Sequence, residues 1–203
     1  NPLNIYAASK KSNELMAYSY SSLYDLPCVG LRFFTVYGPW GRPDMAYFKF
    51  TKNIIEDISI DVYGNGDMFR DFTYIDDITD GIFKLIKVSN NDLFREEKLI
   101  ARKKVPYEIF NIGNDNPVSL NYFISIIEKH LDKKAVKNLF DMQPGDVKRT
   151  SADITKIKSV VDFIPKVRIE EGIPEFIKWY NNYFQSNWFM IAEKSKLPLL
   201  WSI

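Results

Sequence analysis

A short apolar run between two helical patterns constrains the fold of this chain more than any other feature. Residues 28–34 read CVGLRFF, a segment rich in strand-forming residues. The run follows a stretch of helical periodicity from Ala7 to about Tyr24, and Asp25-Leu26-Pro27 breaks that helix. A continuous apolar strand between helices is typical of a parallel sheet that is covered on both faces. The run therefore favours an α/β fold over a helical bundle or a β-sandwich.

The rest of the chain continues this alternation of helices and strands. We expect further strands at 60–63, 70–74 and 108–112, and further helices at 44–57, 76–88, 119–131, 152–162 and 169–184. Asp44, Asp76 or Asp77, and Ser119 stand where the N-caps of three of these helices are expected. Residues 89–106 are polar and strongly charged, which predicts a surface loop or an exposed insertion.

Composition argues against several classes of protein. A chain of 203 residues makes one large domain, or one domain with a smaller lobe. Its 27 basic and 26 acidic residues leave no clustered basic excess, so we expect no nucleic-acid partner. One cysteine and one histidine allow neither an internal disulfide nor a zinc site, so we expect no metal and a cytoplasmic location. No apolar run reaches the roughly 18 residues of a membrane span.

Tyr6 and Lys10 stand four residues apart at the start of the first predicted helix. About one helical turn separates them, so their side chains share one face. A phenol is a poor base at neutral pH, but a nearby ammonium stabilises the phenolate and makes a tyrosine a usable proton acceptor. The spacing alone also arises by chance, so the pair needs support from the rest of the sequence.

Five sequence blocks follow this pair. They are LRFFTVYGP at 31–39, VYGNG at 62–66, RDFTYIDD at 70–77, FNIG at 110–113 and QPGDV at 143–147. In their order and spacing they resemble the extended short-chain dehydrogenase/reductase family, specifically its nucleotide-sugar epimerases. The resemblance covers about residues 1–184. Residues 33–45, FFTVYGPWGRPDM, are most similar to the UDP-glucuronate 4-epimerases.

The resemblance implies roles for individual residues. Tyr6 would be the catalytic acid and base, and Lys10 would hold the nicotinamide ribose of NAD while tuning Tyr6. The backbone from Phe33 to Val36 would lie beside the nicotinamide. The residues implied to bind the UDP-sugar are Thr35 at the sugar, Arg42 at the sugar acid or the diphosphate, Arg70 at the diphosphate, Asp61 and Tyr63 at the uracil, and Asp146 at the uridine ribose.

Some of these residues also have a purely structural interpretation. Arg42 is then a solvated loop arginine, Arg70 is the ion-pair partner of the adjacent Asp71, and Asp146 is a turn residue after Pro-Gly. The family pattern also continues after Gly-Asp-Val with a proline and a later tyrosine. This chain has Lys148 and Ser151 instead, which leaves that edge of the pocket open to question.

The resemblance also implies a domain organisation. We expect the C-terminal part of a Rossmann-like NAD-binding domain at 1–58 and a smaller α/β substrate-binding lobe mainly at 59–184, with some chain crossing back to the sheet. The glycine-rich turn that holds the cofactor pyrophosphate is not found in the sequence. We therefore expect a C-terminal portion of an epimerase that is inactive by itself. The apolar tail at 185–203 matches no part of the family, and its role is open: docking on the fold, attachment to a membrane surface, or no function.

The predicted reaction is NAD-dependent epimerisation at C4 of UDP-glucuronate to UDP-galacturonate through a 4-keto intermediate, in capsule or lipopolysaccharide synthesis. The alternatives are a UDP-glucose 4-epimerase, a UDP-glucuronate decarboxylase, or a non-catalytic module for nucleotide-sugar binding or dimerisation. In the family the Tyr-Lys helix commonly packs against its copy in a second subunit, so we expect a homodimer formed through the helix at 7–24.

Overall fold

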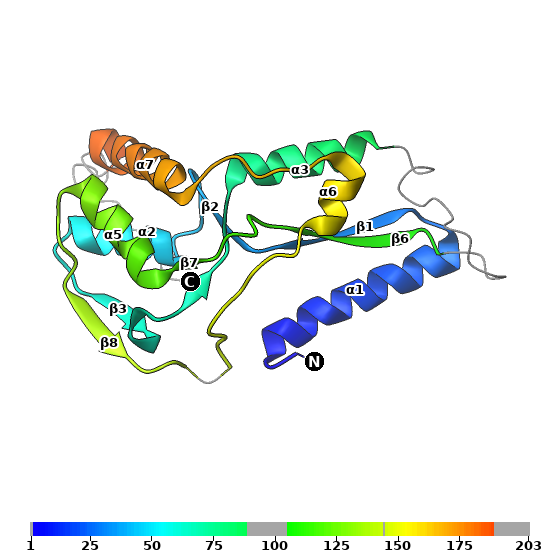
Figure 1. The fold of residues 1–203 in the computed structure, drawn as a ribbon, viewed down its shortest axis with the longest axis horizontal. Coiled ribbons are helices and arrows are strands. Elements are labelled where there is room, and N and C mark those ends of the chain that lie inside the picture. The colour runs from blue at the N-terminus through cyan, green and yellow to red at the C-terminus, as the bar shows by residue number, and fades with distance from the viewer. Residues whose placement is uncertain (1, 89–104, 144, 189–203) are drawn as a thin grey trace.

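The computed structural model describes residues 2–88, 105–143 and 145–188, with side chains as far as residue 184 (Figure 1). Its elements alternate between helices and strands, and three of its four strand pairs are parallel. The expected α/β class is therefore confirmed. Among the described residues, no helix combines the length and apolarity that a membrane crossing requires.

The helices begin and end close to the predicted positions. They are α1 (Ile5–Tyr24), α2 (Ala46–Ile55), α3 (Ile75–Lys87), α5 (Leu120–Leu131), α6 (Thr155–Val161) and α7 (Ile169–Tyr180). The strands are β1 (Cys28–Phe33), β2 (Thr35–Tyr37), β3 (Ile60–Tyr63), β4 (Phe69–Arg70), β5 (Phe72–Tyr74), β6 (Tyr107–Ile112), β7 (Val118–Ser119) and β8 (Lys137–Phe140). A short 3₁₀ helix, η1 (Gly64–Gly66), follows β3, and a π-helical segment, η2 (Asn181–Trp188), follows α7.

Each strand pairs with a strand that lies far from it in the sequence. β1 runs parallel to β6, with Cys28 opposite Tyr107 and Phe33 opposite Ile112. β2 runs parallel to β5, and β3 runs parallel to β8. The short β4 and β7 form the antiparallel pair. Parallel pairs need long crossovers, and here helices supply them.

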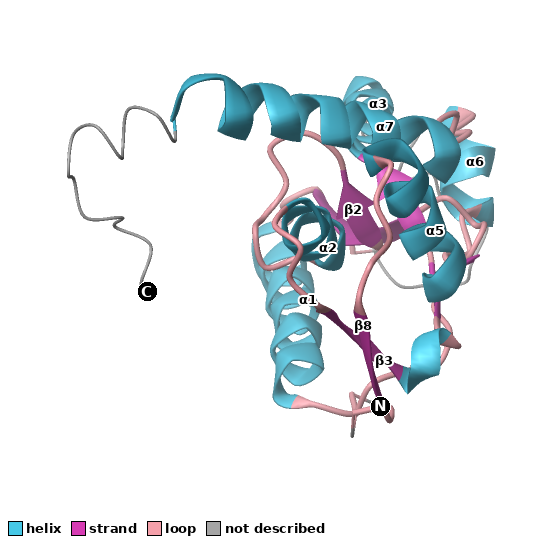
Figure 2. Cartoon of the chain, turned by 90° about the vertical axis from the view of Figure 1, so that its left-hand side faces the viewer, coloured by secondary structure: helices cyan, strands magenta, loops and turns pink. Residues whose placement is uncertain are grey.

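Two apolar cores divide the described chain into two regions. The first, which we call the α5–α7 lobe, packs α2, α5 and α7 around β2, β3 and β5. The second, which we call the β1–β6 region, packs α3 and α6 against β6. The two regions lie at opposite ends of the molecule in Figure 1, and Figure 2 looks onto the lobe. The chain crosses between them more than once, and a domain boundary at residue 58 stays a prediction.

α1 lies on the face of the β1–β6 pair opposite α3 and α6 (Figure 1). Asn4 caps it by accepting a hydrogen bond from the Ala7 amide at 2.8 Å. Of its 20 residues, only Ser21 is buried. The Ser21 hydroxyl donates to the Pro106 carbonyl at 3.1 Å, which ties the end of the helix to the start of β6.

Two capping predictions were wrong, and in each case the carboxylate has another partner. Asp44 does not cap α2: its carboxylate pairs with Arg42, and the helix begins after Met45. Asp77 is not an N-cap either, since it accepts the Lys166 and Val167 amides and so holds the segment that leads into α7.

Other predictions differ only in extent or cannot be compared. The strand expected at 70–74 is split into β4 and β5, which have different partners. The helix expected from residue 152 begins at 155. Ser119 caps α5 as predicted, by accepting the Tyr122 amide at 3.2 Å. The predictions for most of the charged segment 89–106 and for the tail from 189 on lie outside the described residues.

Candidate functional site

A cavity of about 260 Å³ lies at the edge of the α5–α7 lobe, where β3, β4 and β5 meet the start of α2. Its walls are mostly apolar, with a few charged groups among them. Five of the six residues predicted to bind the UDP-sugar line it: Thr35, Asp61, Tyr63, Arg70 and Asp146. An apolar pocket with a few convergent polar groups is the usual form of a small-molecule site.

Arg70 and Asp146 meet in this cavity although they are 76 positions apart in the chain. The Arg70 guanidinium donates to Asp146 Oδ1 at 2.8 Å and to the Phe69 carbonyl at 3.0 Å. The Val147 amide donates to the same carboxylate oxygen at 3.0 Å. Arg70 therefore pairs with Asp146 and not with the adjacent Asp71, so the simple strand ion pair is excluded as the structural explanation for Arg70.

Asp71 was missed as an organising residue by sequence reasoning. Its carboxylate is fully buried and accepts three backbone amides, from Asn114 at 2.9 Å, Asp115 at 3.0 Å and Ala152 at 2.8 Å. Burial raises the pKa of Asp71 above its usual value, although these three hydrogen bonds act in the opposite direction. The available signal was an aspartate inside the aromatic segment FRDFTY at 69–74. Such a segment is expected to be buried, and a buried carboxylate needs several hydrogen-bond donors.

Asp71 also fixes one wall of the cavity. Its carbonyl accepts the Thr35 amide at 3.1 Å, which joins β2 to the strand that follows Arg70. The carboxylate meanwhile holds the turn after β6 and the segment before α6. One buried acid thus connects the backbone of the cavity to the β1–β6 region.

Asp61 and Tyr63 lie at the other end of the cavity, on β3. The Asn138 amide group donates to Asp61 Oδ1 at 3.0 Å, and the Tyr63 ring stacks on Phe140 with centroids 5.5 Å apart. Both partners come from β8, which pairs with β3 over a separation of 77 residues. Sequence analysis did not single out either partner, because only the strand pairing brings them close.

The start of α2 contributes to the same cavity. Met45 is the N-cap of this helix but offers no side-chain acceptor, and Met45 and Ala46 both line the cavity. The first amides of a helix lack intrahelical acceptors and carry the positive end of the helix dipole. Together with Arg70, this helix start gives the cavity a positive end suited to an anionic group.

Tyr6 and Lys10 lie side by side in the first turns of α1, with the Lys10 ammonium 5.4 Å from the centroid of the Tyr6 ring. Tyr6 is 71% exposed. The segment before the helix approaches the loop that carries Asp146, since a side-chain carbon built at Gly145 would lie 4.0 Å from the Leu3 carbonyl oxygen. The predicted pair therefore stands toward the lobe end of its helix.

Arg42 is the one predicted substrate residue that does not line the cavity. Its exposed guanidinium donates twice to the Asp44 carboxylate, and this hydrogen bonding raises the pKa of Arg42. The nearby Tyr6 adds a smaller electrostatic contribution in the same direction. The predicted place of Arg42 at the sugar acid or the diphosphate stays a prediction.

Phe33 and Val36 flank the short break between β1 and β2. The Phe33 side chain is half exposed at the end of β1, whereas Val36 packs against the core of the β1–β6 region. Their predicted place beside the nicotinamide stays a prediction.

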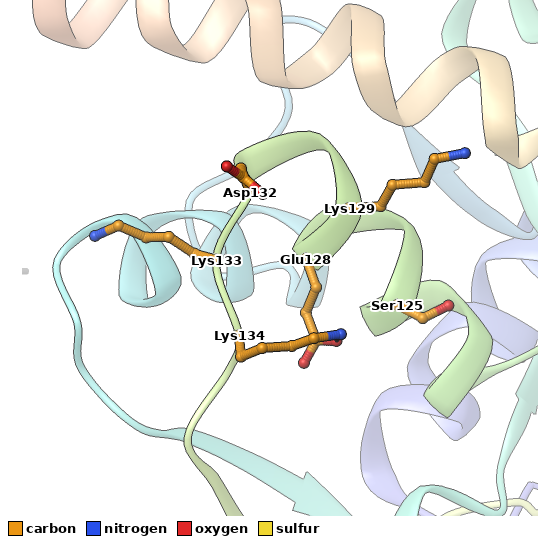
Figure 3. Close-up of a pocket in the computed structure, with 6 residues that line it drawn as sticks. All are labelled: Ser125, Glu128, Lys129, Asp132, Lys133 and Lys134. Atoms are coloured by element: carbon orange, nitrogen blue, oxygen red, sulfur yellow. Dashed lines mark hydrogen bonds and ion pairs between the residues drawn. The ribbon is translucent and has the colours of Figure 1, made fainter.

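A second hollow, of about 340 Å³, lies at the end of α5 and in the turn after it (Figure 3). It is lined by Ser125, Glu128, Lys129, Asp132, Lys133 and Lys134. The buried Glu128 carboxylate is already occupied by Lys134 at 3.0 Å and by the Ala135 amide at 3.1 Å. Lys129 and Lys133 point away from each other in Figure 3. The hollow contains none of the predicted site residues, so we assign the candidate site to the smaller cavity.

Comparison with known proteins shows the family of the chain. A model of the NAD dependent epimerase/dehydratase family matches residues 1–113, which is more than half of the chain. The chain belongs to this family. The matched residues contain the Tyr-Lys pair and four of the five blocks, the last of which ends at residue 113.

Two curated relatives and one solved structure are similar to this chain. Protein CapI of Staphylococcus aureus is 50% identical over 188 residues, which cover 91% of this chain and 56% of that protein. UDP-glucuronate 4-epimerase 1 of Arabidopsis thaliana is 43% identical over 190 residues, which cover 92% of this chain and 44% of that protein. The crystal structure of a Bacillus cereus UDP-glucuronic acid 4-epimerase with UDP-glucuronic acid and NAD superposes with a TM-score of 0.79 at 33% identity, and covers 91% of this chain and 55% of that one.

The chain thus spans about half the length of the relatives that it matches. The family is NAD dependent by its description, and residues of this chain fit part of such a site. Tyr6 and Lys10 are exposed side by side, which leaves the phenol and the ammonium accessible to the ribose and nicotinamide end of a dinucleotide.

Proposed function

We propose that the protein carrying this chain epimerises UDP-glucuronate at C4 to UDP-galacturonate with NAD as cofactor. The observation that carries the proposal is the single cavity in which Thr35, Asp61, Tyr63, Arg70 and Asp146 converge from four different segments of the chain. The similarity of residues 1–184 to UDP-glucuronate 4-epimerases supports the choice of sugar.

In the proposed reaction, Tyr6 removes the proton of the sugar C4 hydroxyl and later returns a proton to the oxygen. Lys10 stabilises the tyrosinate by its positive charge, which lies within 5.4 Å of the phenol ring. NAD, when bound, would supply the acceptor and later the donor of the hydride exchanged with the sugar at C4. Tyr6, Lys10 and the backbone from Phe33 to Val36 would hold its nicotinamide ribose end.

The nucleotide half of the substrate would occupy the cavity. Arg70 and the amides at the start of α2 suit the diphosphate, because both offer donors and positive charge. Asp146 accepts from the ribose hydroxyls once Arg70 turns to the diphosphate. Asp61 and Tyr63 bracket the uracil at the far end of the cavity.

The sugar would lie between the cavity and Tyr6. Thr35, at the start of β2, is half-buried on that side of the cavity. The Arg42 side chain is exposed, so it is available to the sugar carboxylate. Its present partner, Asp44, is also exposed, and exposed ion pairs contribute little free energy. Exchange of Asp44 for a substrate carboxylate therefore costs little.

Product analysis separates the proposal from its alternatives. The protein encoded by the complete reading frame that contains this sequence is incubated with NAD and UDP-glucuronate, and the products are identified by NMR. UDP-galacturonate is the expected product. A UDP-pentose with carbon dioxide identifies a decarboxylase, and turnover of UDP-glucose alone identifies a sister epimerase. Binding of UDP by calorimetry without any turnover identifies a binding module. Inactivity of the 203 residues by themselves stays a prediction.

We also propose that the protein is a homodimer formed through α1, that it acts in the cytoplasm, and that it supplies sugars for capsule or lipopolysaccharide. Support for the dimer comes from Met16, Tyr20 and Leu23, which recur at helical spacing and are more than half exposed. Contiguous exposed apolar surface on a helix is typical of an interface. Light scattering on the full protein tests this: Met16→Glu together with Leu23→Glu is expected to give a monomer. An unchanged mass would contradict an interface on this face.

A further inference from the structure

The loop at residues 38–44 is held in a shape that its sequence does not favour. The Gly41 amide donates to the Gly38 carbonyl at 3.2 Å, so Pro39 and Trp40 are the central residues of a tight turn. Trp40 has a φ of 63°, in the left-handed region that glycine and asparagine adopt most readily. A bulky residue stays in this region only where its surroundings hold it there.

The contacts of the Trp40 ring come from the other end of the described chain. Its centroid lies 5.3 Å from that of Trp179 in α7 and 5.0 Å from that of Tyr183 in η2. Trp179 and Tyr183 stack on each other at 5.5 Å, with 18° between their planes. Trp40 nevertheless remains 72% exposed, so its ring adds little to the apolar core. Its structural effect is therefore to connect the loop to α7 and η2.

Two glycines fix the other sides of the same turn. A side-chain carbon at Gly38 would lie 2.7 Å from the Ile75 Cγ2 atom, and one at Gly41 would overlap the Tyr47 hydroxyl. The loop backbone is therefore pressed against the starts of α3 and α2. The ring of Trp40 makes the third contact of the turn. Unlike the contacts at Gly38 and Gly41, it is made by a side chain at the centre of the turn.

Arg42 follows this turn directly. Its carbonyl accepts the Met45 amide at 3.2 Å, while its side chain is exposed and pairs, among the described residues, only with Asp44, which is also exposed. A long exposed arginine loses much rotamer freedom when it binds a carboxylate, so the position of its backbone decides how well it reaches the ligand.

We propose that Trp40, through its ring contacts with Trp179 and Tyr183, is a positioning residue. It holds the backbone of the loop so that Arg42 can reach the carboxylate of the sugar. This inference rests on the proposed function, in which Arg42 receives that carboxylate. The contacts of Trp40 with Trp179 and Tyr183 would then affect substrate specificity. They would matter for a UDP-sugar that carries an acid group, and not for the UDP moiety, which is proposed to bind in the cavity of the α5–α7 lobe.

The test compares three variants at one position in the full protein with NAD bound. Trp40→Ala is expected to raise the KM for UDP-glucuronate about tenfold and to leave kcat within about threefold. Trp40→Phe keeps an aromatic ring and is expected to stay near the parent. Trp40→Gly fits the positive φ better than tryptophan, yet it is expected to behave like Trp40→Ala because the ring contact is lost. The dissociation constant of UDP is expected to be unchanged in all three.

A double-mutant cycle with Arg42→Met tests whether Trp40 acts through Arg42. Arg42→Met alone is expected to raise the same KM, and adding Trp40→Ala is expected to raise it little further. If Arg42→Met raises the KM and Trp40→Ala does not, the positioning role is overturned and the proposed function stands. If Arg42→Met has no effect, the carboxylate contact itself is wrong. If Trp40→Ala weakens UDP binding as much as UDP-glucuronate binding, the contacts of the Trp40 ring are only structural and the proposal is overturned.

Discussion

α1 and α5 carry the two halves of the proposed chemistry in opposite ways. α1 presents Tyr6 and buries one residue of its 20, whereas α5, whose first residue lines the cavity proposed for the nucleotide, buries five of its 12. The lobe around α5 therefore has its own core. α1 is attached to the sheet by a few polar and aromatic contacts. Binding and catalysis are thus supported by regions of very different packing, and the predictions below test that separation.

The largest effect is expected from Tyr6→Phe, which removes one hydroxyl from the catalytic helix. A positioned acid–base group contributes about 10²–10⁴-fold to a rate, so kcat for UDP-glucuronate is expected to fall by that factor. Calorimetry is expected to give an unchanged affinity for UDP, because the cavity lies in the other region. Activity within tenfold of the parent would show that another residue moves the proton.

Asp71→Ala tests the junction between the two regions. It leaves three buried backbone amides without their acceptor and is expected to lower the free energy of unfolding by about 3 kcal/mol. Urea denaturation measures this loss. The matched control is Asp115→Asn, which removes an exposed carboxylate in the adjacent turn and leaves the Asp115 amide in place. Equal destabilisation by both variants would contradict the organising role of Asp71.

Arg70→Ala tests the positive end of the cavity. A hydrogen bond to a charged group contributes about 1.5–3 kcal/mol, so the affinity for UDP is expected to fall roughly 10–100-fold by calorimetry. Arg149→Ala is the matched control, because this exposed arginine packs on Phe69 beside Arg70 but does not line the cavity. If both variants bind UDP equally well, the diphosphate lies elsewhere.

These contrasts also explain which parts of the structure the sequence made predictable. The strand at 28–33 and the helix that ends at Tyr24 follow from local patterns of apolar and breaking residues, and both were found. The cap of α2 was misjudged because Asp44 has a competing arginine two residues earlier. The capping preference of an aspartate takes no account of a neighbouring arginine that binds the same carboxylate.

The site was predictable as a set of residues but not as a geometry. Motif blocks gave Arg70 and Asp146, yet their contact across 76 positions depends on how the strands pair. The partners of Asp61 and Tyr63 on β8 had no motif of their own, so only the pairing of β3 with β8 reveals Asn138 and Phe140. Which strands pair over long distances depends on how the apolar faces of strands and helices are buried together. The pattern of a single sequence does not distinguish between the possible pairings.

The smallest effect is expected where α1 is held to the sheet. Arg32 on β1 donates two hydrogen bonds to the Glu14 carboxylate, with Nη2 2.7 Å from Oε2, and this bonding lowers the pKa of Glu14 from its ordinary 4.5 to about 2. Because the pKa is lower in the folded protein, the stabilisation is complete above pH 4.5 and is lost as the pH falls toward 2. The pair is partly exposed, so screening reduces its contribution to about 1 kcal/mol.

Glu14→Gln is therefore expected to cost about 1 kcal/mol at pH 7 and nothing near pH 2, as measured by urea denaturation at a series of pH values. Arg32→Gln is expected to cause most of this loss, and the double variant little more than Glu14→Gln alone. Both single variants remove the Glu14–Arg32 pair, and Glu14→Gln also removes the exposed pair with Lys11 at 2.8 Å. Hydrogen exchange in α1 is expected to quicken while exchange in α5 is unchanged. Equal quickening in both helices would mean that α1 and the lobe unfold together, and the separation between a rigid binding lobe and a lightly held catalytic helix would fail.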